Sequence, residues 1–178
     1  MGRIIKPLSL MGAKISSDIN ETPPLQISGK TKLHAIHYDL PIASAQVKSS
    51  ILLAGLYAEG ITTLTEPAVT RDHTERMLIS MGAKFNKSSN KLCIEGKNEL
   101  HGCDISVPAD LSSASFIILA ALIARKADVL IQNVGINPTR TGVIDILKSM
   151  GAQITLENEQ QSSGEPVADI RVKSSKLV

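Results

Sequence analysis

The tripeptide Met-Gly-Ala occurs three times in this chain at nearly constant intervals. It begins at Met11, Met81 and Met150, so the intervals are 70 and 69 residues. At the 69-residue interval Thr70-Arg71 falls on Thr139-Arg140. Self-similarity at a fixed period is typical of a fold built from repeated supersecondary units. The repeat therefore restricts the chain to a modular architecture before any single element is assigned.

Each full repeat reads as a β-α-β-α-β-β unit, which makes the fold class α/β. In the first repeat strands are expected over 31–40, 61–65, 83–86 and 91–95, and helices over 44–58 and 70–81. In the second, strands are expected over 104–107, 129–133, 153–157 and 168–173, helices over 112–124 and 139–150, and a polar loop over 160–166. Residues 1–29 read as the tail of an earlier unit, with a helix over 4–11 and strands over 14–17 and 25–28.

The two helices of the first repeat are expected to differ in burial. Lys48 is the only charged residue between 44 and 58, so that helix is predicted to be buried on most sides. The helix over 70–81 reads as amphipathic and is predicted to end at Gly82 in a left-handed conformation. Its expected core side is Met77, Leu78 and Met81, and its expected water side is Arg71, Asp72, Glu75 and Arg76.

Charge and composition exclude several partners. The 19 basic and 17 acidic residues are scattered and only four residues are Phe or Tyr, which argues against nucleic acid. The longest apolar run, over 116–124, is about half of what a membrane-spanning helix needs, so no membrane partner is expected.

Cysteine and histidine spacing gives no sign of a disulfide framework or a metal. Cys93 and Cys103 are too few for such a framework, so reduced thiols and a cytoplasmic location are expected. The histidines match no zinc-binding spacing, and no metal is predicted; they are His34, His37, His73 and His101.

Two features could bind an anion. The helix over 44–58 opens with Ser44-Ala45-Gln46, and a helix N-terminus presents free N–H groups and a positive dipole end that can hold a phosphate. The alternative is that Ser44 only caps the helix. Ser112-Ser113-Ala114-Ser115 in the second repeat admits the same two interpretations.

Arg71 is the second feature, because a cation in the first turn of a helix is repelled by the helix dipole. Asp72 or Glu75 could balance it, or a phosphorylated ligand could. Arg140 occupies the corresponding place in the second repeat. His73 could serve a ligand or act as a general base, or could simply be half-exposed. The sequence contains no nucleophilic triad, Walker loop or dinucleotide fingerprint.

Three stretches, over 40–49, 66–78 and 137–142, resemble the 3-phosphoshikimate 1-carboxyvinyltransferase (EPSP synthase) family, and the similarity spans essentially the whole chain. The resemblance implies the enolpyruvyl transferase fold, an inside-out α/β barrel with two domains of three such units each. It places 1–106 in the first domain, as the end of one repeat plus one full repeat, and 107–178 as the first repeat of the second domain. The chain is then an incomplete middle segment, which would explain why Met1 reads as the inside of a helix.

The resemblance also implies an activity without a cofactor: transfer of the enolpyruvyl group of phosphoenolpyruvate to the 5-hydroxyl of shikimate 3-phosphate, in the shikimate pathway to aromatic amino acids. Ser44, Ala45, Gln46 and Arg71 match the family's substrate-binding positions. Many members carry serine where Ala45 stands, and the Ser-Ala-Gln branch, class II-like, includes enzymes poorly inhibited by glyphosate. No catalytic acid or base is assigned on this chain, so it is expected to be inactive without the remaining segments of the same enzyme.

Two alternatives remain open from the sequence. One is the sister activity of UDP-N-acetylglucosamine 1-carboxyvinyltransferase, whose strings match less well. The other is a noncatalytic α/β module that keeps the repeat for packing or for binding a phosphorylated ligand.

Overall fold

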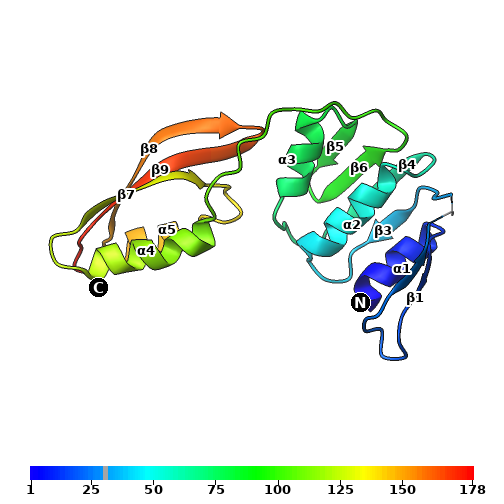
Figure 1. Cartoon of the computed structure of the whole chain (residues 1–178), viewed down its shortest axis with the longest axis horizontal. Helices are drawn as coiled ribbons and strands as arrows, with labels where there is room; N and C mark the ends of the chain where they lie inside the picture. Colours follow the sequence, from blue (N-terminus) through cyan, green and yellow to red (C-terminus); the bar gives the residue numbers. More distant parts are fainter. Residues whose placement is uncertain (30–31) are drawn as a thin grey trace. The chain divides into compact units, whose positions relative to one another are not determined.

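The computed structural model of this chain describes residues 1–29 and 32–178. The chain divides into two units, Met1–Gly102 and Cys103–Val178, and Figure 1 follows it through both. The boundary expected from the sequence lies between residues 106 and 107. The assignment of each unit to one domain of a longer enzyme stays a prediction.

The first unit contains two sheets. Helix α1 (Gly2–Leu10) precedes an antiparallel pair, β1 (Lys14–Ser16) and β2 (Gln26–Ser28). The larger sheet has the order β3-β4-β6-β5, with β3 (His37–Asp39), β4 (Ile61–Thr65), β5 (Phe85–Ser88) and β6 (Lys91–Glu95). Strands β3 and β4 are parallel and are joined through α2 (Ala45–Gly55), whereas the other pairs are antiparallel. With α3 (His73–Ser80) between β4 and β5, the predicted β-α-β-α-β-β order is confirmed.

The first strand and first helix of this unit are shorter than predicted. Only three residues form β3, although Ala35 and Ile36 still bond to the backbone of Glu59 and Thr63, and residue 31 lies outside the described residues. Helix α2 ends at Gly55 because the next turn tightens: the N–H groups of Tyr57 and Ala58 each bond to the carbonyl three residues earlier.

Helix α3 begins three residues later than predicted, after Asp72. It ends as expected, because Gly82 has a φ of +86° and accepts the left-handed conformation that other residues resist. Gly151 ends the corresponding helix of the second repeat at a φ of +91°. The predicted core side is only partly right, since Leu78 is 4% exposed but Met77 is 46% exposed.

The second unit packs two helices against one antiparallel sheet. Its elements are α4 (Leu111–Ile123), β7 (Asp128–Gly135), α5 (Gly142–Ser149), β8 (Gln153–Ser162) and β9 (Glu165–Lys173), with the sheet order β7-β9-β8. The expected strand over 104–107 is wrong. That segment is extended and exposed, and only a single parallel bridge, between Ala109 and Val134, stands where β3 pairs with β4 in the first repeat.

The polar loop expected over 160–166 is also wrong, because β8 and β9 continue through it to a tight turn. The pairing register shifts between Glu157 and Gln160, and Asn158 there has a φ of +52°. This irregularity leaves the residues between Glu157 and Gln160 unpaired with β9, and the β8–β9 pairing continues from Gln160. In the turn, the hydroxyl of Ser163 donates to the carbonyl of Asp104 at 2.7 Å, which joins the segment 104–107 to the hairpin.

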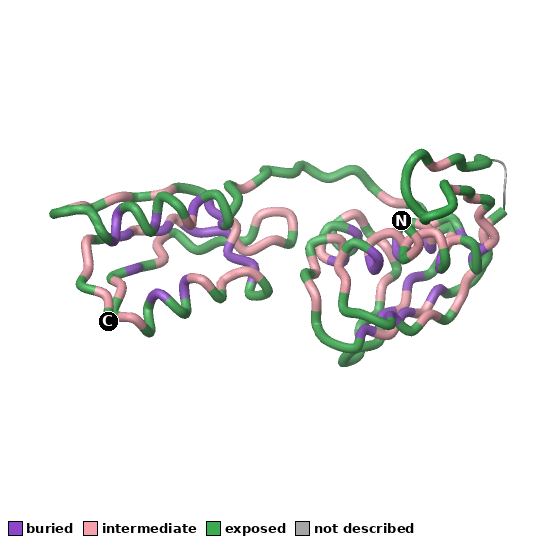
Figure 2. Tube along the Cα trace, turned by 90° about the horizontal axis from the view of Figure 1, so that it is seen from below, coloured by how far each residue is buried: buried purple, intermediate pink, exposed green. Residues whose placement is uncertain are grey.

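Each unit has its own hydrophobic core. Figure 2 shows buried residues within both units, whereas the segment that joins them is exposed. In the second unit α4 buries one side on the sheet, with Ile118 fully enclosed. Its other side stays apolar and open, since Phe116 and Ile123 are each 77% exposed.

Candidate functional site

The N-terminus of α2 has the geometry of a capped helix end. Ser44 adopts an extended conformation, with φ −148° and ψ 109°, and its Oγ accepts the N–H of Val47 at 3.4 Å. The next two residues, Ala45 and Gln46, lie in the first turn, where no carbonyl of the same helix can accept their N–H groups. Ser44 and Ala45 are half-buried and Gln46 is exposed. The cap interpretation of Ser44 is therefore correct, and it leaves two amide groups open to an anion.

Arg71 lies just outside α3 and not in its first turn, which corrects the sequence prediction. Asp72 is the residue that precedes the helix, so Arg71 stands one position further out. Its side chain is exposed, and among residues 1–29 and 32–178 it takes part in no hydrogen bond or ion pair. Neither Asp72 nor Glu75 pairs with it, since Asp72 binds Arg76 at 3.0 Å and Glu75 binds Lys48 at 2.6 Å. The guanidinium group is thus available to a ligand.

Side-chain contacts tie α2 to α3. Ser49 and Thr74 share a hydroxyl–hydroxyl hydrogen bond of 2.7 Å, and the ion pair of Lys48 with Glu75 joins the same two helices. The expectation that Glu75 faces water is wrong, because this ion pair holds it inside with only 3% of its surface exposed. The contacts therefore join Lys48 and Ser49 of α2 to Thr74 and Glu75 of α3. Ser44 and Gln46 lie at the N-terminal end of the same α2, and Arg71 lies two residues before α3.

In the second repeat the corresponding groups bind one another. The cap of α4 is Asp110, whose carboxylate accepts the N–H of Ser113 at 2.9 Å. Arg140 pairs with the same carboxylate at 3.2 Å and also donates to the hydroxyl of Ser112. The Ser113 N–H lowers the pKa of Asp110, and Arg140 acts in the same direction. The anion-site interpretation of Ser112-Ser113-Ala114-Ser115 is therefore wrong, because an ionised carboxylate of the chain already occupies that helix end.

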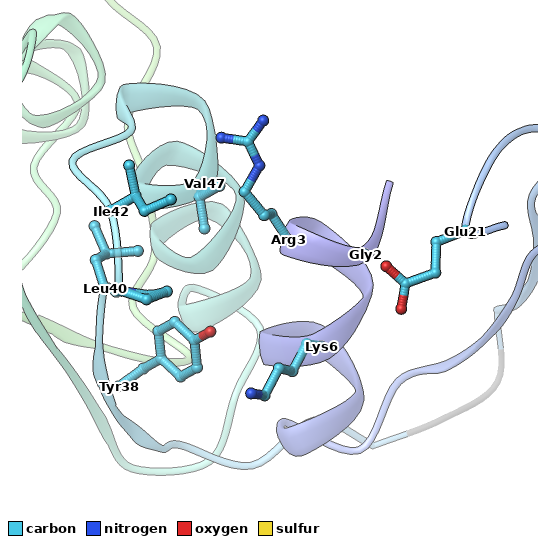
Figure 3. A pocket seen from close by; sticks show the side chains of 9 residues that line it. Gly2, Arg3, Lys6, Glu21, Tyr38, Leu40, Ile42 and Val47 are labelled. Atoms are coloured by element: carbon cyan, nitrogen blue, oxygen red, sulfur yellow. The ribbon is translucent and has the colours of Figure 1, made fainter.

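A cavity of about 240 Å³ lies beside α2 in the first unit. Two cations of α1, Arg3 and Lys6, line it together with Tyr38 and Glu21, and Figure 3 shows the guanidinium of Arg3 reaching past Val47. Sequence reasoning missed these cations. Their spacing of three residues, which places two side chains on one helix face, is the signal that could have found them.

The four histidines are all exposed. His73 is exposed at the first position of α3, and His37 makes an exposed contact with Asp39 at 3.2 Å. Within the described residues no group of three or more metal-ligating side chains comes together. In that same part of the chain, no helix has the length and apolar character needed to cross a bilayer. Cys93 and Cys103 do not form a disulfide.

Comparison with known proteins finds relatives across nearly the whole chain. Residues 1–177 match the sequence profile of EPSP synthase (3-phosphoshikimate 1-carboxyvinyltransferase). The chain is 55% identical over 177 residues to the 3-phosphoshikimate 1-carboxyvinyltransferase of Alkalilimnicola ehrlichii and 56% identical over 182 residues to that of Hydrogenovibrio crunogenus, in each case over 99% of this chain. It spans 40% and 41% of those two relatives.

The likeness extends to three dimensions. A crystal structure of EPSP synthase from Acinetobacter baumannii matches with a TM-score of 0.92 and 56% identity, covering 99% of this chain and 40% of that one. The repeated α/β units are therefore those of that enzyme's fold. The sugar-nucleotide transferase and the noncatalytic module find no support in these comparisons. The chain belongs to the EPSP synthase (3-phosphoshikimate 1-carboxyvinyltransferase) family.

Proposed function

We propose that this chain contributes part of the substrate site of an enzyme that transfers the enolpyruvyl group of phosphoenolpyruvate to the 5-hydroxyl of shikimate 3-phosphate. The chain spans about 40% of the length of its relatives, so the complete site includes groups from the rest of such an enzyme. Membership of the family carries the proposal, and the anion-binding geometry at α2 and Arg71 supports it. The cytoplasm, where the thiols of Cys93 and Cys103 stay reduced, is the proposed location.

The reaction joins an acceptor oxygen to an enol carbon and expels phosphate. The 5-hydroxyl oxygen adds to C2 of phosphoenolpyruvate while C3 gains a proton, which gives a tetrahedral intermediate. Loss of phosphate from C2 and of a proton from C3 then restores the double bond. Both steps need general acids and bases, and we assign none of these roles to residues of this chain.

The role of this chain is to hold the anionic acceptor. The two open amide groups of the α2 N-terminus face the substrate phosphate, with the helix dipole favouring its negative charge. Gln46 adds an amide side chain at the same helix end, where it can contact both substrates. Arg71 supplies the full positive charge that the amides lack. Ala45 offers only its backbone, so one hydroxyl contact available to relatives with serine there is missing.

A hybrid enzyme tests the proposal. It is the Acinetobacter baumannii EPSP synthase in which residues 1–177 of this chain replace the matching segment, which is 56% identical. We expect phosphate release that requires both shikimate 3-phosphate and phosphoenolpyruvate. A folded hybrid without this activity contradicts the proposal, and release driven by UDP-N-acetylglucosamine instead would favour the sister transferase.

Matched glutamine variants of the hybrid then test the site. Gln46→Ala should lower kcat/KM about tenfold or more, because a hydrogen bond to a charged group contributes roughly 1.5–3 kcal/mol. Gln26→Ala, at an exposed position of β2, is the control and should leave kcat/KM unchanged. Equal effects of the two substitutions would show that Gln46 does not contact the substrates.

A further inference from the structure

Three charged side chains meet inside the first unit, and we refer to them as the buried charge cluster: Lys48, Glu66 and Glu75. The Nζ of Lys48 lies 3.1 Å and 3.3 Å from the two carboxylate oxygens of Glu66 and 2.6 Å from Oε1 of Glu75. Their side chains are 0%, 2% and 3% exposed. A single ammonium group on α2 therefore binds both ends of the segment 66–75.

Burying the cluster in a core is unfavourable in free energy compared with burying apolar side chains. It holds one ammonium and two carboxyl groups, and Oε2 of Glu75 has no hydrogen-bond partner among the described residues. Removing charges from water costs free energy that ion pairing repays only in part, so apolar residues of similar size often stabilise such a position equally well or better. Packing alone does not account for this arrangement.

The second repeat fills the corresponding positions without charge. Lys48 is four residues after the cap Ser44, and Ala114 is four residues after the cap Asp110. Glu75 and Ile144 are 69 residues apart, as are the helices α3 and α5 that carry them. Both Ala114 and Ile144 lie in the hydrophobic core of the second unit.

The third position keeps its hydrogen bond but loses its charge. Glu66 and Asn137 each precede a proline and are 1% and 2% exposed. Glu66 accepts the hydroxyl of Thr70 at 2.5 Å, and Asn137 accepts that of Thr139 at 2.6 Å. The same fold thus forms with charged residues at these positions in the first repeat and with neutral residues in the second. The fold itself therefore does not need the charges, and their role is specific to the first repeat.

The two repeats differ in the arginine that follows this threonine. Arg140 is held by Asp110 and Ser112, whereas Arg71 has no partner among the described residues. We infer that the buried charge cluster positions Arg71 for the substrate. Lys48 lies on the same helix as Ser44 and Gln46, and it binds the segment 66–75 through Glu66 before Arg71 and Glu75 after it. Lys48, Glu66 and Glu75 are then positioning residues. This inference rests on the proposed function, since the substrate is shikimate 3-phosphate.

The decisive variant is Glu75→Ile in the hybrid enzyme, because it copies the residue at the corresponding place in α5 and leaves a neutral Lys48–Glu66 pair. Calorimetry should show shikimate 3-phosphate binding about tenfold weaker, with a melting temperature unchanged or higher. In the Arg71→Ala background the same substitution should cost less than about twofold, because residues that act through one another are not additive. Glu95→Gln, which removes a carboxylate from an exposed ion pair, is the charge-matched control and should change neither quantity.

Several outcomes would overturn the inference. A folded Glu75→Ile variant with wild-type affinity would remove the positioning role, and a full further loss in the Arg71→Ala background would show that Glu75 acts independently of Arg71. If Glu75→Ile does not fold, Glu75→Gln replaces it, and failure of both would make the cluster structural. Absence of shikimate 3-phosphate binding by the unmutated hybrid would instead refute the proposed function, and this inference with it.

Discussion

Replacing Arg71 by alanine should separate an effect on substrate binding from an effect on stability. Arg71 is exposed and has no hydrogen-bond or ion-pair partner among the described residues. Its removal therefore breaks no hydrogen bond or ion pair among the described residues, and the free energy of unfolding should stay within about 0.5 kcal/mol of wild type. Any larger effect has to come from a ligand.

The expected loss of affinity follows from the charge that Arg71 balances. A charge-assisted hydrogen bond contributes roughly 1.5–3 kcal/mol, and each 1.4 kcal/mol corresponds to a factor of ten. Arg71→Ala in the hybrid enzyme should therefore bind shikimate 3-phosphate about ten- to a hundredfold more weakly. Because the substrate carries a phosphate and a carboxylate, the difference between wild type and variant should shrink as salt concentration rises.

Arg140→Ala is the matched comparison, since both arginines follow the threonine of their repeat. Arg140 is 24% exposed and pairs with Asp110 at 3.2 Å, so its removal should lower the urea midpoint of unfolding. It should change affinity by less than about threefold. Titration calorimetry and urea unfolding on the same samples measure both quantities. Equal affinity losses, or a loss for Arg140→Ala alone, would refute the assignment of the site to the first repeat.

Further outcomes are expected elsewhere in the chain. Ser44→Ala should lower the free energy of unfolding by roughly 0.5–1 kcal/mol in a urea titration through loss of the helix cap, and an unchanged value would mean that its 3.4 Å bond contributes nothing. Gly82→Ala and Gly151→Ala should each lower the free energy of unfolding by roughly 1–2 kcal/mol because both glycines have a positive φ. Gly142→Ala, where an added Cβ meets no atom within 4 Å, should leave the free energy of unfolding unchanged or raise it by up to about 1 kcal/mol. Equal effects of all three substitutions would contradict the conformational argument. Arg171 donates to the carboxylate of Asp128 at 2.8 Å and 3.0 Å and lowers the pKa of that carboxyl. The contribution of this pair to the stability of the fold is therefore present at neutral pH and is lost as the pH falls below about 4. Thermal melts from pH 7 to pH 2 should show a smaller acid loss for Asp128→Asn than for wild type, and parallel curves would exclude this pair as a source of the pH dependence.

Much of the fold could be predicted because the repeat is visible in the sequence itself and because a glycine that ends a helix is a local signal. Strands β4 and β6 have the predicted bounds, and both Gly82 and Gly151 end helices at positive φ. The errors occur where tertiary contacts decide. The strand expected over 104–107 lacks a continuous partner, and β8 extends into the polar stretch because it pairs with β9 on both sides of the register shift between Glu157 and Gln160.

The candidate site was less accessible to sequence reasoning. The cap at Ser44 could be predicted from residue type, and the burial of much of α2 from the absence of charges other than Lys48 in it. The burial of Glu75 could not, because its partner is 27 positions away in sequence and on another helix. Nor could the sequence show that Asp110 would pair with Arg140 while Arg71 has no hydrogen-bond or ion-pair partner in the described part of the chain.

The carboxylate of Asp110 has a consequence for how duplicated units diverge. After a duplication both copies start with the same arginine, and each must settle where its positive charge is balanced. A copy with an internal carboxylate at the helix end balances its arginine within the chain and needs no ligand to do so. In this chain the charge that balances Arg140 at the helix end is the carboxylate of Asp110, and Asp110→Asn, which a single nucleotide change can produce, would remove it.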